Sequence, residues 1–193
     1  MRHSRLSAAL AALVVLATAC TSEKQIVSTP APVPQPILDS VPYVCKLIPE
    51  QAFRLVSGVS GSLVEKTNGN ERNGDCAVPE TTPQSLGVWW MQEGSGMPQG
   101  HLDFLMNGRR NIYTRHGGVM LPADLGDGMA AHVTNNDQPY RVSAKFGCGG
   151  KDRLIDIYLA QVAKGRDAIK DMTELMRIAQ KRYGKLYNCT PGT

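Results

Sequence analysis

The stretch Tyr140-Arg141-Val142-Ser143-Ala144-Lys145-Phe146 decides the fold, because apolar and polar side chains alternate along it. Successive side chains of a β-strand point to opposite faces of the sheet. Tyr140, Val142, Ala144 and Phe146 therefore share one face, and the polar residues between them share the other. This alternation predicts an antiparallel strand with one face on the core and the other face in water.

Further strands are predicted on both sides of this stretch. Residues 153–160 alternate in a similar way. Residues 85–93 carry apolar side chains on both faces, which predicts a central strand that is covered on both sides. Shorter strands are expected at residues 62–66, 76–78 and 129–134.

Apolar residues at three- and four-residue steps predict three helices. The first begins at Pro49 and stops at Gly58, the second covers residues 101–112, and the last covers residues 166–183 and stops at Gly184. The order of helix, strands, helix, strands and helix predicts an α+β fold, an antiparallel sheet with helices packed on it. The buried face of the second helix is expected to hold Leu102, Leu105, Met106 and Ile112.

The first 19 residues have the layout of a secretory signal peptide. Arg2 and Arg5 precede an uncharged, mostly apolar run of 12 residues, which small residues follow. As a helix this run is about 18 Å long, whereas the hydrocarbon core of a bilayer is about 30 Å thick. The run therefore predicts a signal peptide over residues 1–19 and not a permanent membrane helix.

The end of this signal, Ala17-Thr18-Ala19-Cys20, resembles the lipobox of bacterial lipoproteins. The resemblance implies that Cys20 becomes the first residue of the mature protein and carries acyl chains such as palmitate. The bilayer is then a partner of the protein through Cys20. The alternative is an ordinary signal peptide that is cut near Ala19, with an unmodified Cys20.

Residues 20–42 are predicted to form a linker, because five prolines favour an extended, semi-rigid chain. Such a linker spans up to about 65 Å and leads to a single domain over residues 43–193. Removal of Arg2 and Arg5 with the signal leaves 19 basic residues against 17 acidic ones. This near balance makes neither nucleic acid nor another polyanion an expected partner.

Four cysteines remain in the predicted domain, namely Cys45, Cys76, Cys148 and Cys189. An even number in an exported chain predicts two disulfides, for which three connectivities are possible. We favour Cys45–Cys76 with Cys148–Cys189, because each pair closes one half of the domain. The sequence has no C-x-x-C and no closely spaced histidines, so neither a metal nor another cofactor is expected.

These features together resemble a family of actinobacterial, mycobacterial-type secreted lipoproteins. The likeness rests on the lipobox, the proline-rich linker, the entry Cys45-Lys46-Leu47-Ile48-Pro49-Glu50, the second cysteine about thirty residues later and the closing helix. It implies a sandwich similar to the PsbP-like fold and to the extracellular sensor domain of mycobacterial kinases. It also implies a place on the extracytoplasmic face of the plasma membrane, but no reaction.

Two sets of residues are candidates for ligand binding. Trp89 and Trp90 are adjacent on a strand, so their rings point to opposite faces. Either both rings belong to the core, or one lines a hydrophobic or sugar-binding cleft. Arg109, Arg110 and Arg115 can bind anionic lipid headgroups or wall polymers, or they form the solvated end of a helix, where the helix dipole favours cations.

No catalytic motif is present, because the sequence contains no G-x-S-x-G nucleophile elbow and no phosphate-binding glycine loop. We therefore expect a non-catalytic domain that binds an envelope ligand or a protein partner. The alternative is a secreted hydrolase whose residues meet only in the fold. The candidate residues for such a site are His116, Asp124 and Ser95.

Overall fold

The computed structural model describes residues 35–79, 84–94, 96 and 98–192. Every helix and strand described belongs to one unit, which lies within residues 35–192. Cys20, the signal peptide and most of the predicted linker thus lie outside the described residues, as does Ser95.

The described residues form an α+β structure, as the sequence predicts, with one large antiparallel sheet. Its strands are β3 (Lys66–Gly69), β4 (Gly74–Val78), β5 (Leu86–Gln92), β6 (Val119–Met120), β7 (Asp127–His132), β8 (Tyr140–Cys148), β9 (Asp152–Leu159) and β10 (Pro191–Gly192). They lie in the order β3-β4-β5-β9-β8-β7-β6. β10 pairs with the end of β8, where β7 no longer runs beside it.

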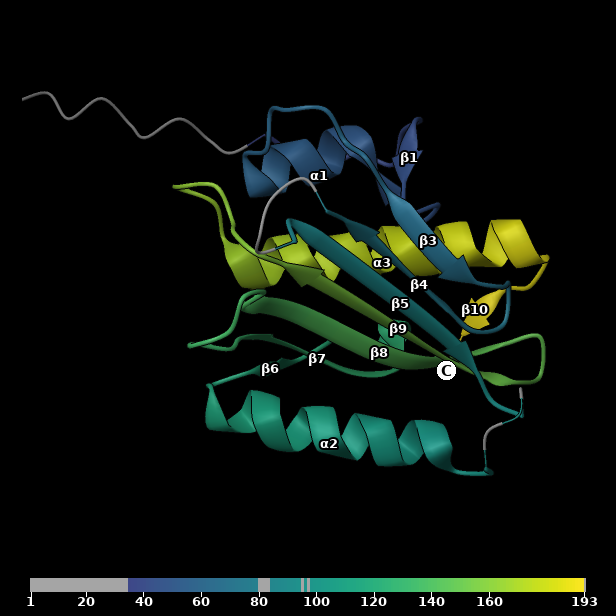
Figure 1. Cartoon of the computed structure of the whole chain (residues 1–193). Coiled ribbons are helices and arrows are strands. Elements are labelled where there is room, and N and C mark those ends of the chain that lie inside the picture. The colour runs from purple at the N-terminus through teal and green to yellow at the C-terminus, as the bar shows by residue number, and fades with distance from the viewer. Residues whose placement is uncertain (1–34, 80–83, 95, 97, 193) are drawn as a thin grey trace, which may run out of the picture. The chain divides into compact units, whose positions relative to one another are not determined.

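Helices cover both faces of this sheet (Figure 1). α1 (Glu50–Ser57) and α3 (Ala168–Tyr187) pack on one face, and α2 (His101–Arg115) packs on the other. The short strands β1 (Tyr43–Val44) and β2 (Ile48–Pro49) pair with each other just before α1, and the 3₁₀ turn η1 (Ala123–Leu125) precedes β7. α1 ends as predicted at Gly58, which has the left-handed conformation.

In β8, one face lies on the core as predicted, but the other face is not in water. Val142, Ala144 and Phe146 are buried in the main core under α1 and α3. The opposite face, however, does not lie in water. Ser143 is fully buried, and Asp156 on β9 is 1% exposed, because α2 covers this face. The polar residues indicated a wet face, but they serve a buried polar cluster instead.

α2 is longer than predicted and turns a different side toward the sheet. Ile112 is 43% exposed, whereas Tyr113 is buried together with Leu102 and Met106. A prediction that selects apolar residues misses Tyr113, since tyrosine is amphipathic. Its hydroxyl is satisfied within the protein by the Ser143 hydroxyl at 2.8 Å.

The end of α3 and the first edge strand also differ from prediction. Gly184 does not stop the last helix, which continues to Tyr187 and ends at Asn188 in the left-handed conformation. The strand predicted at residues 62–66 begins only at Lys66, because β3 is an exposed edge strand. Its register is set by the turn into β4 and not by burial.

Gly184 has a packing role, and this gives a testable pair of substitutions. A Cβ at this position would lie 2.5 Å from the carbonyl oxygen of Cys189 and 2.7 Å from the Pro191 ring. We therefore expect Gly184→Ala to lower the free energy of unfolding by about 1–3 kcal/mol. Gly108→Ala in α2 is the control, because a Cβ there meets nothing within 4 Å. This control is expected to stabilise the protein by about 0.4–1 kcal/mol in urea unfolding, and equal effects of the two changes would contradict the account.

Both favoured disulfides are present. Cys45–Cys76 joins the turn between β1 and β2 to β4, across 31 residues. Cys148–Cys189 joins the end of β8 to the segment after α3, across 41 residues. Each bond therefore fixes one helix-containing segment to the sheet.

Residues 35–42, at the end of the predicted linker, lie on the domain. The Arg166 side chain donates to the carbonyl oxygen of Gln35 at 3.1 Å. Asp39 accepts a hydrogen bond from Tyr43 at 2.7 Å and pairs with Lys181 at 3.3 Å. The chain is thus already attached to α3 before β1 begins. Among the described residues, no helix has both the length and the apolar character needed to cross a membrane.

Candidate functional site

The two tryptophans predicted as binding residues have different surroundings. Trp90 is 2% exposed in the main core, and its indole nitrogen donates to the carbonyl oxygen of Asn70 at 2.7 Å. Trp89 is half-buried on the α2 face, with its ring 4.8 Å from that of Tyr158. The guanidinium carbon of Arg141 in turn lies 4.5 Å from the centre of the Tyr158 ring. Trp90 is therefore a core residue, whereas Trp89 belongs to an aromatic and cationic cluster.

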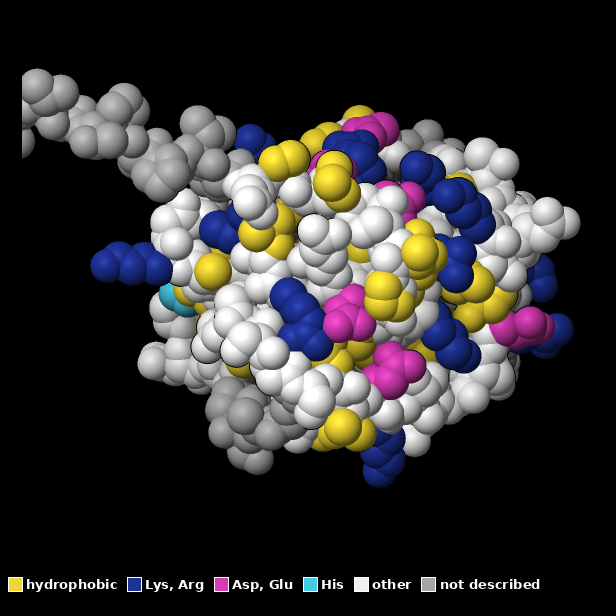
Figure 2. Space-filling view, turned by 90° about the horizontal axis from the view of Figure 1, so that it is seen from above, with side chains coloured by type: hydrophobic (Ala, Val, Ile, Leu, Met, Phe, Trp, Pro, Cys, Tyr) yellow, Lys and Arg dark blue, Asp and Glu magenta, His cyan; other side chains and the backbone are white. Residues whose placement is uncertain are grey.

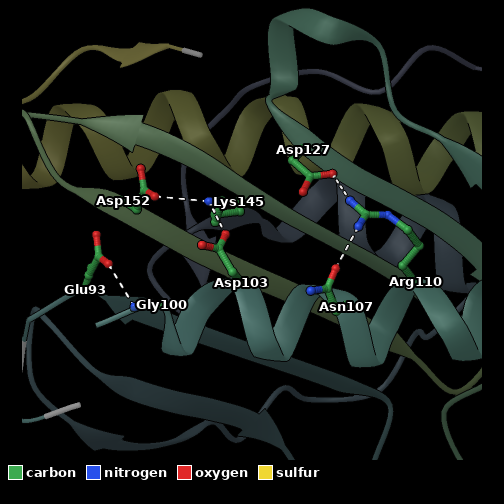
Figure 3. Close-up of polar contacts among 8 residues, drawn as sticks. All are labelled: Glu93, Gly100, Asp103, Asn107, Arg110, Asp127, Lys145 and Asp152. Atoms are coloured by element: carbon green, nitrogen blue, oxygen red, sulfur yellow. Dashed lines mark hydrogen bonds and ion pairs between the residues drawn. The ribbon is translucent and has the colours of Figure 1, made fainter. Parts of the chain in front are cut away.

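The predicted arginine cluster is divided among structural contacts. Arg110 pairs with Asp127 at 2.5 Å and also donates to Asn107 at 2.9 Å (Figure 3). In the same view Lys145 of the sheet lies between Asp103 of α2 and Asp152. These pairs attach α2 to the sheet. Arg115 is exposed at the end of α2.

Arg109 holds the centre of the α2 interface. Its Nε donates to Asp156 Oδ1 at 2.6 Å, and its Nη2 contacts the second oxygen of the same carboxylate. Ser143 donates to Asp156 at 2.5 Å, so the Tyr113 hydroxyl must donate its proton to Ser143. Burial alone would lower the pKa of Arg109, but the hydrogen bonds and negative charge of Asp156 raise it above its usual value. Burial raises the pKa of Tyr113 far above its usual range, so this hydroxyl remains a neutral donor.

Of the three residues named for a hydrolase, the two that the structure describes, His116 and Asp124, are not brought together. His116 Nδ1 lies 3.3 Å from the Thr134 hydroxyl, next to the end of α2. Asp124 forms an ion pair with Arg177 of α3, on the other side of the sheet. Ser95, the third member, is not among the described residues.

The sulfurs of Cys45 and Cys76 lie with a carboxylate oxygen of Glu65 within 4.8 Å of one another. Both sulfurs belong to a disulfide, so they are not thiolate ligands for a metal in this state. Glu65 has a structural partner in this group, because it accepts a hydrogen bond from the backbone N–H of Cys45 at 2.5 Å.

The most distinctive candidate site is a pocket at the C-terminal end of α3, which we call the Arg153 pocket. It has a volume of about 440 Å³, within the usual size range of small-molecule sites. Four parts of the fold meet there: the turn between β3 and β4, the end of β5, the β8–β9 turn with the start of β9, and the last turn of α3. Its lining is Glu71, Arg72, Gln92, Gly149, Lys151, Arg153, Tyr183, Leu186, Tyr187 and Asn188.

Arg153 lies at the base of this pocket and has an unusual environment. Its side chain is on the α3 face of β9, and the residue is only 8% exposed. Among the described residues it forms no ion pair, and its buried Nε has no hydrogen-bond partner. Its Nη1 donates a weak hydrogen bond to the carbonyl oxygen of Asp152 at 3.4 Å, and its guanidinium also interacts with the Tyr183 hydroxyl, which is a neutral group and not an anion. Burial of a cation without an anion costs free energy, so an anionic ligand that pairs with Arg153 would be stabilised here.

Two tyrosines of α3 form one wall of the pocket. Tyr183 is 1% exposed, and its hydroxyl donates to the carbonyl oxygen of Glu71 at 3.4 Å. Burial raises the pKa of Tyr183, although the nearby positive charge of Arg153 lowers it in part. Burial likewise raises the pKa of Tyr187, whose ring is 4.4 Å from that of Tyr183. Both hydroxyls therefore stay protonated; that of Tyr183 already donates to the carbonyl oxygen of Glu71, and that of Tyr187 can donate to a ligand.

The sequence forms this pocket through strand register and a disulfide. Antiparallel pairing places Arg153 opposite Phe146 on one side and Gln92 on the other. The bond between Cys148 and Cys189 holds the β8–β9 turn beside the end of α3. The negative end of the α3 dipole also lies here, and it favours the cations before any ligand binds.

The sequence analysis did not predict this site, although one signal was present. Arg153 stands at the start of the series Ile155, Ile157 and Leu159, which all face the main core. A charged residue in register with an apolar strand face is either at the rim of the core or part of a site. The remaining lining residues lie in two turns, at the end of β5 and at the end of α3, and their spacing in the sequence gives no information on their proximity.

Comparison with protein-family models, with curated proteins and with solved structures gives no significant match for this chain.

Proposed function

We propose that this chain is a lipid-anchored lipoprotein on the extracytoplasmic face of the plasma membrane, of the actinobacterial type, and that its domain binds an anionic small molecule without catalysis. The observation that carries the binding function is the buried Arg153 guanidinium, which lies in a pocket and has no carboxylate partner among the described residues.

The proposed location is supported by the order of features in the sequence. A signal-like segment ends in Ala17-Thr18-Ala19-Cys20, and a proline-rich linker follows. Acylation of Cys20 gives the linker an anchored end. Two disulfides within one domain are typical of proteins that fold in an oxidising compartment.

Binding is favoured over hydrolysis by the chemistry of the pocket lining. The described residues that line it supply guanidinium, ammonium, amide and phenol groups and one carboxylate, that of Glu71, whereas serine, histidine and free cysteine are not among them. On the side of α1, basic side chains stand beside acidic and apolar ones (Figure 2). Such a mixed face does not create the single-sign field that attracts polyanions. A defined pocket is therefore the better candidate for recognition.

Intact-mass spectrometry of the full chain, purified from the envelope of an actinobacterial host, tests this proposal. We expect loss of residues 1–19, acyl chains on Cys20, two disulfides and, under native conditions, a retained anion. Cys20→Ser should move the protein from the membrane to the soluble fraction, whereas the control Thr21→Ser should not. A cytosolic protein with residues 1–19 intact and free thiols would contradict the proposal.

A further inference from the structure

We propose that the anion recognised by the Arg153 pocket is a phosphomonoester, carried by a sugar, a small polyol or a lipid headgroup. This inference rests on the proposed binding function and goes beyond it by naming the ligand class. It follows from the charges, the donors and the space that the pocket combines.

The charge of the lining fits a dianion better than a monoanion. Arg72 comes from the turn between β3 and β4, whereas Lys151 and Arg153 come from the β8–β9 turn and the start of β9, and among the described lining residues Glu71 alone is acidic. The balance of these side chains is two positive charges. A phosphomonoester carries about −1.5 to −2 charges at pH 7, whereas a carboxylate carries one. Phosphate therefore neutralises the lining, and a single carboxylate does not.

The donors in the pocket also suit a phosphate group. Arg153 lines the pocket with a planar guanidinium that no carboxylate neutralises among the described residues, and such groups bind phosphate oxygens in pairs. Its Nε is itself buried, so the outer nitrogens are the ones that can reach a ligand. The hydroxyl of Tyr187, whose pKa burial raises, remains a donor at neutral pH, and Lys151 and Arg72 add further donors from the lining. Three phosphate oxygens can accept bonds from donors on several sides, whereas the two oxygens of a carboxylate lie in one plane.

The pocket has room for more than the phosphate itself. Its volume of about 440 Å³ leaves space for an organic group next to the anion. Half-buried Tyr187 and exposed Leu186 give this part an apolar wall. The ring face of a tyrosine packs well against the C–H groups of a sugar or polyol, while Asn188 can bond its hydroxyls. Soluble sugar phosphates and lipid headgroups share this chemistry.

Isothermal titration of the mature full chain in detergent micelles tests the inference. The probes are glucose 6-phosphate, inorganic phosphate, glucuronate and glucose, together with vesicles that contain phosphatidic acid. We expect glucose 6-phosphate to bind at least tenfold more tightly than glucuronate, and glucose not to bind. Binding to the phosphatidic acid vesicles alone, provided that Arg153→Met weakens it, would support the same chemistry with a lipid headgroup as its source, because insertion of the acyl chains does not depend on Arg153.

Three variants assign the binding to this pocket. Arg153→Met should weaken binding of glucose 6-phosphate at least tenfold, and Arg153→Lys should weaken it less. Arg177→Met removes a charge from α3 outside the pocket, where Arg177 pairs with Asp124, and should change the affinity less than twofold. Urea unfolding of each variant verifies that it is folded.

The possible failures are distinguishable. If glucuronate binds as tightly as glucose 6-phosphate and Arg153→Met abolishes both, the phosphomonoester is wrong and the anion pocket stands. If neither phosphate nor carboxylate probes bind, or if their affinity does not depend on Arg153, the ligand class and the proposed binding function both fail.

Discussion

Asp156→Ala is expected to lower the free energy of unfolding by about 3–5 kcal/mol, the usual cost of breaking a buried ion pair from one side. Asp156 is 1% exposed and accepts hydrogen bonds from Arg109 and Ser143. Its removal leaves the guanidinium buried against the sheet without an anion. Ser143 loses its acceptor, so the hydrogen bond from Tyr113 is disturbed as well. Urea unfolding at pH 7 measures the effect.

A double variant separates the charge from the packing. Arg109→Met combined with Asp156→Leu removes both charges and keeps apolar volume under α2. Because an ion pair that is replaced as a whole leaves no orphaned charge, this variant should lose much less stability than Asp156→Ala. Asp152→Ala is a further control, since this carboxylate is 41% exposed and shares Lys145 with Asp103. A loss of less than about 1 kcal/mol in Asp156→Ala would show that α2 does not depend on this pair.

Removal of either disulfide is expected to cost about 2–5 kcal/mol. The bonds close loops of 31 and 41 residues, for which the chain-entropy model gives about 3.5–4 kcal/mol each. The Cys45→Ala/Cys76→Ala variant should be affected at least as strongly as the other pair, because both of its cysteines are almost fully buried. Thermal and urea unfolding of the two double variants provide the measurement.

The two disulfides should differ in their effect on the pocket. Cys148→Ala/Cys189→Ala releases the segment that carries Asn188 from the turn that carries Gly149, and both of these residues line the Arg153 pocket. Ligand affinity should therefore fall in this variant when it is measured below its unfolding transition. The Cys45→Ala/Cys76→Ala variant, whose bond lies away from this lining, should retain affinity. An equal loss of affinity in both would mean that the pocket depends only on overall stability.

Much of the fold could be predicted from local sequence patterns. The alternation in β8 and β9 and the four-residue steps of α3 reflect burial in the main core, and the doubly apolar β5 reflects its cover on both faces. These patterns are strong because burial of apolar surface dominates folding energetics. Both disulfides followed from cysteine parity and from the two halves that the pairs close.

The errors share a physical cause, which is that polar residues do not show from sequence whether they meet water or one another. Ser143, Asp156 and Arg109 have the pattern of a solvated face, yet they satisfy one another beneath α2. The Arg153 pocket was missed for the same reason. Arg72 lies far in the chain from Lys151 and Arg153, and the pairing of β4, β5 and β9 brings them together, while the Cys148–Cys189 bond adds the end of α3.

The most direct test of the central claim is the side-chain Nε–Hε signal of Arg153 in ¹⁵N-resolved NMR of the mature chain. Arg109 is an internal reference, because its Nε is already bonded to Asp156 at 2.6 Å. On titration with glucose 6-phosphate, the Arg153 signal is expected to shift in a saturable way, whereas the Arg109 signal stays in place. An Arg153 signal that does not move while the phosphate binds elsewhere would contradict the account.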